Sequence, residues 1–208
     1  MNFDGFEIGV DELLNGTTTL NDIFYLEDLN QRKLYINTEI EQYTIADVVR
    51  HILEFNKQDS GIPVEDRKPI ILYVVSCGGE PDSGFELIDV IQMSKTPVYT
   101  VNLGYQYSMG FFVGLAGHKR FATKNAKFLM HDGVTGIVDS TAKVEDRFEF
   151  NKKNEARVKE YVLSVSNVTS EEYDSKRRFE WYMFAEEAKE KGFTDYIIGV
   201  DCDVDEII

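Results

Sequence analysis

Ser108 begins a run of small and apolar residues, 108–117, that is typical of a buried helix start. A serine hydroxyl becomes a nucleophile at neutral pH only when a neighbouring base accepts its proton. A helix start also places free main-chain N–H groups and a favourable dipole beside that hydroxyl. The chain has three histidines, so the hypothesis of a serine nucleophile can be examined residue by residue.

One of the three histidines stands where a catalytic base is expected. His51 lies inside a predicted helix, and His118 lies in a polar turn beside two cations, where we expect solvent exposure. His131 instead follows the apolar strand predicted at 127–130 and precedes a loop, so the strand would deliver its side chain to a cleft. The ordinary pKa of imidazole, about 6.5, suits proton transfer to and from a serine. A structural histidine at a strand end explains this position equally well.

Two glycines, Gly78 and Gly79, follow the buried strand predicted at 70–75 and precede a helix. Their lack of side chains lets main-chain N–H groups face a cavity, as an oxyanion hole requires. A plain strand-to-helix turn is the simpler interpretation of a single Gly-Gly pair. Cys77 has no neighbour in sequence that would favour a thiolate, so we interpret it as structural. With 37 acidic residues in the chain, spacing alone does not choose the acid of a triad.

Composition limits the class of protein. A chain of 208 residues, 43% of them hydrophobic, can form one domain with a sizeable core. The formal net charge of -15 would repel nucleic acid and an anionic membrane surface, so neither is expected as a partner. Two cysteines are too few for a disulfide framework or a zinc site, and no metal or other cofactor is predicted. Without a secretory leader pattern or a long apolar segment, a cytoplasmic protein is expected.

The hydrophobic pattern predicts alternating strands and helices. The strands are expected at 33–37, 70–75, 98–103, 120–122, 127–130 and 195–198, and the helices at 45–56, 82–94, from 108, and at 185–191. Because strand and helix alternate, we expect an α/β fold with a largely parallel sheet. The acidic and then polar first residues predict a mobile arm, 1–20, followed by a single domain, 21–208.

A long charged helix is predicted at about 141–167, with apolar residues towards both ends and a strongly polar middle. Two interpretations fit this pattern. The helix is either solvated along the surface of the domain, or it projects as an arm whose two ends pack on something else.

Four segments in one order resemble the proteolytic subunits of the Clp protease, the ClpP family, over about 21–198. The segments are the Gly-Gly turn at 76–79, the serine segment 104–110, the stretch 119–131, and 185–195. The resemblance implies a ClpP/crotonase-like α/β fold, a spiral of β-β-α units. It also implies that the helix at about 141–167 is a protruding handle, which interleaves with the handles of an opposing ring.

The resemblance implies catalytic roles for individual residues. Ser108 would be the nucleophile, and His131 would be the general base and acid. The main-chain N–H groups of Gly79 and Met109 would form the oxyanion hole, where loss of one donor typically costs about 10²- to 10³-fold in rate.

The third triad position departs from the family, which has aspartate where this chain has Glu180. A glutamate can hold and stabilise an imidazolium, but its extra methylene requires a shifted backbone or histidine. Asp174 is a nearby substitute that falls out of register with the motif, so it ranks second. The loop after the histidine, 132–133, also differs from the family.

The resemblance implies an assembly as well as an activity. Two stacked heptameric rings, a tetradecamer, would enclose a chamber into which a hexameric AAA+ unfoldase threads unfolded polypeptides. Residues that match the family's apolar docking pocket for the unfoldase are Ile71, Tyr73, Met93 and Phe121. Strand and helix residues of these types also occur as plain core.

Three functions follow from these observations. The leading hypothesis is a serine endopeptidase subunit that depends on ATP only through its partner. The alternative is a non-catalytic ClpP-like subunit of a mixed ring, motivated by Glu180 and the altered loop after His131. A third is an acyl-CoA enzyme on the same fold, which would leave the pairing of Ser108 with His131 accidental.

Overall fold

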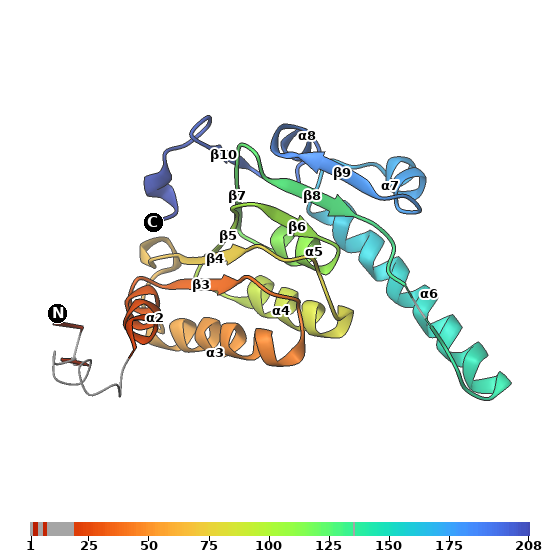
Figure 1. Ribbon diagram of the computed structural model, residues 1–208, viewed down its shortest axis with the longest axis horizontal. Helices are drawn as coiled ribbons and strands as arrows, with labels where there is room; N and C mark the ends of the chain where they lie inside the picture. The colour runs from red at the N-terminus through yellow and green to blue at the C-terminus, as the bar shows by residue number, and fades with distance from the viewer. Residues whose placement is uncertain (1, 4–5, 8–18, 135) are drawn as a thin grey trace.

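The computed structural model describes residues 2–3, 6–7, 19–134 and 136–208 (Figure 1). Its main sheet has five strands, all parallel, in the order β10-β7-β5-β4-β3. These strands are β3 (Lys33–Ile36), β4 (Ile70–Val74), β5 (Val98–Asn102), β7 (Lys119–Thr123) and β10 (Tyr196–Ile198). The structure thus confirms the predicted α/β fold with a parallel sheet.

Helices connect the strands and cover one side of this sheet. The helices are α2 (Leu20–Asn30), α3 (Gln42–Gln58), α4 (Pro81–Met93), α5 (Met109–Leu115), α6 (Thr141–Ser164), α7 (Ser170–Lys176) and α8 (Ala185–Glu190), with 3-10 turns η1 (Val64–Asp66) and η2 (Val204–Glu206). Side chains alternate across each strand. Ile70, Leu72 and Val74 of β4 therefore join the main core with α3 to α5, whereas Ile71 and Tyr73 form a separate cluster on the other side.

A second sheet of three strands lies beside the first. It contains β6 (Tyr105–Tyr107), β8 (Lys127–Met130) and β9 (Trp181–Phe184), with β6 parallel and β9 antiparallel to β8. The hydrophobic pattern predicts β8 but neither β6 nor β9. All four residues of β9 are apolar or aromatic, so its buried Trp181 and Met183 do not stand out from its exposed Tyr182 and Phe184.

The hydrophobic pattern predicts no helix between the arm 1–20 and the strand near residue 33, but the structure has α2 there. Thr19 and Asp22 form a capping box that starts this helix. Only Ile23 of α2 is buried, so no apolar stripe marks the helix in the sequence. β1 (Asn2–Phe3) pairs antiparallel with β2 (Phe6–Glu7). The rest of the predicted arm 1–20 lies outside the described residues, apart from 19–20.

Helix α6 projects from the two sheets in Figure 1. It ends at Ser164, a few residues before the predicted end, and Val162 is its only residue that is buried. Arg120 fixes the end of this helix at the body, because its guanidinium donates to the carbonyls of Val165 and Gly192 at 2.7 Å each. Phe148 and Phe150, further out on α6, are exposed.

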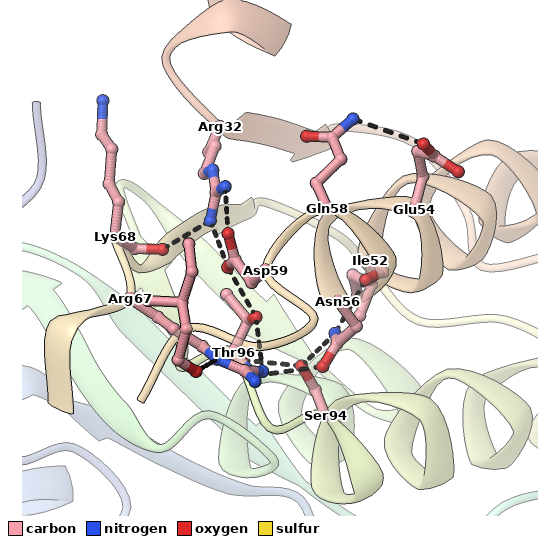
Figure 2. A network of polar contacts seen from close by, with 11 residues as sticks. Arg32, Ile52, Glu54, Asn56, Gln58, Asp59, Arg67, Lys68, Ser94 and Thr96 are labelled. Carbon is pink, nitrogen blue, oxygen red and sulfur yellow. Dashed lines mark hydrogen bonds and ion pairs between the residues drawn. The ribbon is translucent and has the colours of Figure 1, made fainter. Parts of the chain in front are cut away.

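A buried ion pair ties the first helices to the main sheet (Figure 2). Arg32, between α2 and β3, adopts a left-handed φ of 61° and donates twice to the carboxylate of Asp59, at 2.6 Å each. Thr96 also donates to Asp59, at 2.8 Å, and the Arg32 guanidinium reaches the carbonyl of Lys68 at 2.9 Å. The hydrogen bonds from Arg32 are the main reason that the pKa of Asp59 is lowered.

We expect Asp59→Asn to lower the free energy of unfolding by about 3–5 kcal/mol, because it leaves the Arg32 guanidinium without its counterion. A lowered folded-state pKa contributes stability above the unfolded-state pKa of about 3.9, which is lost as the pH falls through the folded value. The variant lacks the Asp59 carboxylate, so between pH 5 and pH 2 it should lose less stability than the wild type. The difference should be roughly the free energy that the lowered pKa of Asp59 contributes. Urea unfolding across that range measures both effects.

Asp47→Asn is the matched control for this prediction. Asp47 pairs with Arg50 at 3.2 Å, but both side chains are exposed, so we expect a change below about 1 kcal/mol. Equal losses in the two variants, or equal acid sensitivity of Asp59→Asn and the wild type, would contradict the prediction.

Candidate functional site

The chain beyond β4 joins the two sheets at Ser76. Its N–H donates to the carbonyl of Tyr105 at 3.1 Å, and its carbonyl accepts from the N–H of Tyr107 at 2.9 Å. Ser76 thereby forms a parallel bridge with Gln106 of β6. The Gly-Gly turn that follows Ser76 consequently lies against the end of β6, where Ser108 begins the next turn.

Ser108 occupies a sharp turn between β6 and α5. Its φ of 52° and ψ of -123° are sparsely populated for a residue with a side chain, so the backbone is strained. The N–H of Ser108 donates to the carbonyl of Leu129 at 3.0 Å, and its own carbonyl accepts from the N–H groups of Phe111 and Phe112. These bonds hold the strained turn between a strand and a helix.

The Gly-Gly turn packs directly on this serine. A Cβ at Gly78, whose φ is 106°, would lie 2.7 Å from Cβ of Ser108 and 2.9 Å from N of Met109. A Cβ at Gly79 would lie closer still to the carbonyl oxygen of Ile40. The N–H of Ile40 donates to the carbonyl of Gly78, and its carbonyl accepts from the N–H of Glu80, at 2.8 Å each. Only glycines fit between these two stretches of main chain.

The two predicted oxyanion donors both have unoccupied N–H groups. Neither Gly79 nor Met109 donates a main-chain hydrogen bond to any of the residues that the structure describes. Met109 is the first residue of α5, where an N–H has no partner within the helix. Because a Cβ at Gly78 would lie 2.9 Å from the nitrogen of Met109, the Gly-Gly turn lies close beside the start of α5.

Strand register brings His131 and Glu180 to the same edge of the small sheet. The last pair of β8 and β9 is Met130 with Trp181, and His131 directly follows β8 where Glu180 directly precedes β9. Because Met130 and Trp181 are paired, the residues that flank them are close in space, although the ladder itself ends there. Ser108 follows β6 at this edge, since its N–H bonds Leu129 of β8.

The three side chains are not joined to one another in this structure. Among the described residues, no hydrogen bond links the hydroxyl of Ser108, the ring of His131 and the carboxylate of Glu180. Glu180 is exposed, and the pKa of Tyr182 is raised by lost hydration first and by the nearby Glu180 carboxylate second. The carboxylate of Glu180 therefore lies on the Tyr182 side of the strand.

Asp174, the second candidate for the acid, is engaged elsewhere. Its carboxylate accepts from Lys159 of α6 at 2.7 Å, and this pair connects α7 to the projecting helix. The end of the β8–β9 ladder beside Glu180, and the ion pair that engages Asp174, together favour Glu180 as the neighbour of His131.

Arg177 fixes the loop that follows His131. Its carbonyl accepts from the N–H of Asp132 at 3.0 Å, and its guanidinium lies 3.8 Å from the Asp132 carboxylate and 3.4 Å from that of Glu155. Burial raises the pKa of Asp132, and the positive charge of Arg177 opposes this shift. The loop is thus attached to the end of α7 through Arg177, which also pairs with Glu155 of α6.

Sequence reasoning gave no role to Ser76 or Ile40, although both shape the site. The hydroxyl of Ser76 accepts from the N–H of Gly78 at 3.1 Å and donates to the carbonyl of Thr38 at 2.7 Å. Ile40 supplies the main chain that pairs with the Gly-Gly turn. The position of Ser76 directly after the apolar run 70–75 was the only signal of its role in the sequence. Nothing in the sequence marks Ile40.

Three of the four predicted docking residues come together, and the fourth does not. Ile71, Tyr73 and Phe121 are buried in one cluster on the side of the main sheet opposite the core helices. Met93, at the end of α4, is 65% exposed and lines a separate cavity of about 410 Å³.

Two further findings apply to the described part of the chain alone. No group of three or more His, Cys, Asp or Glu side chains there is arranged to hold a metal ion. None of its helices combines the length and the apolar character that a membrane span needs.

Comparison with known proteins assigns the family. The family model described as Clp protease matches residues 16–201, which include every segment of the site described above. The chain belongs to the Clp protease family. Its parallel sheet, second sheet and projecting helix agree with the fold that this family implies.

Several Clp protease relatives are moderately similar along most of their length. The proteolytic subunit 1 of Streptomyces avermitilis is 33% identical over 82% of this chain and 76% of its own. The proteolytic subunit 3 of Streptomyces coelicolor is 32% identical over 85% and 79%. The proteolytic subunit 2 of Treponema pallidum is 27% identical over 85% and 86%.

We expect Gly78→Ala to destabilise the protein more than Gly61→Ala does. Both glycines have positive φ, 106° and 95°, but a Cβ at Gly61 meets nothing within 4 Å. Gly61→Ala therefore measures the backbone strain alone, about 1–3 kcal/mol, whereas Gly78→Ala adds the collision with Ser108 and Met109. Thermal or urea unfolding of the two variants measures the difference, and equal losses would show that the close approach has no energetic consequence.

Proposed function

We propose that the chain is a serine endopeptidase subunit that hydrolyses peptide bonds of unfolded polypeptides. The strained turn at Ser108 carries the proposal, because strained backbone conformations cluster at active sites, where the surrounding structure maintains them. That turn lies between the strand end bearing His131 and two unoccupied N–H groups, those of Gly79 and Met109. A nucleophile, a base and oxyanion donors are the parts that acyl transfer needs.

The proposed reaction passes through an acyl-enzyme. The Ser108 hydroxyl oxygen attacks the scissile carbonyl carbon while His131 takes its proton, and the N–H groups of Gly79 and Met109 donate to the resulting oxyanion. His131 then protonates the leaving amine as the C–N bond breaks. In the second half, His131 removes a proton from water as the water attacks the acyl carbon. The bond from that carbon to the Ser108 oxygen then breaks, and His131 returns the proton to this oxygen.

Glu180 is the proposed orienting carboxylate. Its place directly before Trp181, which pairs with Met130 beside His131, supports this role, and the extra methylene lets its carboxylate swing from the Tyr182 side towards the ring. Burial of this edge by a substrate or a neighbouring subunit would favour the closed triad, because catalytic hydrogen bonds often tighten only in the complex.

The proposal includes ring assembly and a partner. We propose that helix α6 and the segment 132–138 of each subunit pack between two heptameric rings in the cytoplasm. A hexameric AAA+ unfoldase would feed polypeptides into the chamber that these rings enclose. The exposed Phe148 and Phe150 on α6, and Val134 and Val138 in the segment, support the packing, since such side chains favour burial. The relatives' names describe ATP-dependent proteolytic subunits.

The second candidate function is a non-catalytic subunit of a mixed ring. The open arrangement of Ser108, His131 and Glu180 favours it, as does the glutamate in place of the family's aspartate. The two candidates differ in whether Ser108 reacts, and this can be measured directly.

A fluorophosphonate should form one covalent adduct on Ser108 of the assembled protein, visible as a single mass increase of the intact chain. Ser108→Ala should abolish the adduct, whereas Ser175→Ala, which alters an exposed serine of α7, should retain it. An unlabelled wild type would reject the peptidase in favour of the structural subunit.

Glu180→Gln should lower kcat for a fluorogenic peptide by roughly 10²- to 10⁴-fold with little change in KM, because the neutral amide does not stabilise the imidazolium. Glu180→Asp should retain more activity than the amide. Glu186→Gln, at an exposed carboxylate of α8, serves as the control and should leave kcat unchanged. Full activity of Glu180→Gln together with a loss in Asp174→Asn would transfer the role to Asp174.

A further inference from the structure

One side of the main sheet carries an apolar cluster to which no described helix contributes. Parallel sheets usually have helices on both faces, but here the helices contribute to the opposite core. We call this second surface the aromatic face. Its sheet residues are Ile71, Tyr73, Tyr99, Val101, Phe121, Tyr196 and Ile198.

The residue that completes the aromatic face comes from the segment 203–208. Ile207 is 4% exposed and is the only buried residue of this segment, whereas its neighbour Ile208 is 65% exposed. The hydroxyl of Tyr73 donates to the main-chain carbonyl of Ile207. One aliphatic side chain and one carbonyl therefore make the contact, while in Figure 1 the segment folds back from β10 at the edge of the molecule.

The chain is held firmly up to residue 202 and weakly beyond it. The Asp201 carboxylate binds Lys189 at 2.6 Å and accepts from the N–H of Ile197 at 2.7 Å. In contrast, the acidic side chains of Asp203, Asp205 and Glu206 are exposed and form no ion pair with the described residues.

The energetics of such a contact favour easy opening. The gain from burying one aliphatic side chain is of the same order as the entropy lost in ordering a few residues. Segments with few buried contacts occupy the low-stability end of local unfolding. The segment 203–208 should thus leave the aromatic face without unfolding the sheet beneath it.

We propose that the segment 203–208 is a displaceable intramolecular cover of the aromatic face. Ile207 occupies the place that an aliphatic side chain of a docking protein takes, and its carbonyl occupies the acceptor position for the Tyr73 hydroxyl. A partner peptide of this chemistry binds only after the cover leaves, so the cover sets a threshold for docking. That the docking protein is the unfoldase rests on the proposed function, whereas the covering of the aromatic face by 203–208 does not.

Hydrogen–deuterium exchange of the wild-type protein tests whether the cover opens. Amides of 203–208 should exchange well before those of β4, although Ile207 N–H is bonded to the carbonyl of Val204 at 3.0 Å. Tyr73→Phe, which removes only the hydroxyl, should speed exchange in 203–208 further and leave β4 unchanged. Protection of the segment equal to that of β4, or no effect of Tyr73→Phe, would overturn the proposal.

Binding in trans tests whether the vacated face accepts a ligand. The probe is a fluorescein-labelled peptide reproducing residues 199–208, with serine in place of its cysteine. Ile207→Ser protein should bind this peptide roughly tenfold or more tighter than the wild type, because the tethered competitor is gone. Ile208→Ser is the matched control and should behave as the wild type, since that side chain is already exposed.

A second peptide, with serine also at the position of Ile207, should not bind. Equal binding of the probe to all three proteins, or binding that ignores this serine, would overturn the proposal. Peptidase activity is not measured in any arm, so an inactive Ser108 would leave these results standing. Circular dichroism of the Ile207→Ser protein establishes its folding, and if it is unfolded the exchange experiment on the wild type and Tyr73→Phe decides alone.

Discussion

Two main-chain hydrogen bonds at Ser76 connect the parallel sheet to the small sheet, and the candidate site depends on this junction. Without it, the Gly-Gly turn after β4 and the turn after β6 would have no fixed relation. The Ser76 hydroxyl adds a bond to Gly78 and another to Thr38. The residue therefore fixes the Gly-Gly turn of the candidate site through its main chain and its side chain together.

Close packing at that junction explains the strain at Ser108. The turn at Ser108 must bring β6 into α5 while leaving room for Gly78, and a positive φ accomplishes this in one residue. The strain persists because Leu129 on one side and α5 on the other hold the turn. The strained turn costs local stability, and it places the Ser108 hydroxyl at the edge of the small sheet formed by β6, β8 and β9.

The two faces of the main sheet serve different purposes in this Clp protease family member. The face covered by helices forms the core that supports the site, and within the segment 203–208 a single side chain, Ile207, covers the aromatic face. Docking would consequently exchange one small apolar contact for another of the same chemistry. Such an exchange requires no rearrangement of β4, whose opposite side supports the core.

The sequence alone determined the features that are encoded locally. The β-branched run of β4, the small residues after Ser108 and the strand before His131 predict their elements, because periodicity and burial act on neighbouring residues. Tertiary structure decided what depends on distant segments. The pairing of β9 with β8 brings Glu180, which precedes Trp181, to the strand end that carries His131, although the two residues are far apart in sequence. No local pattern records such contacts, since their energy comes from partners remote in sequence.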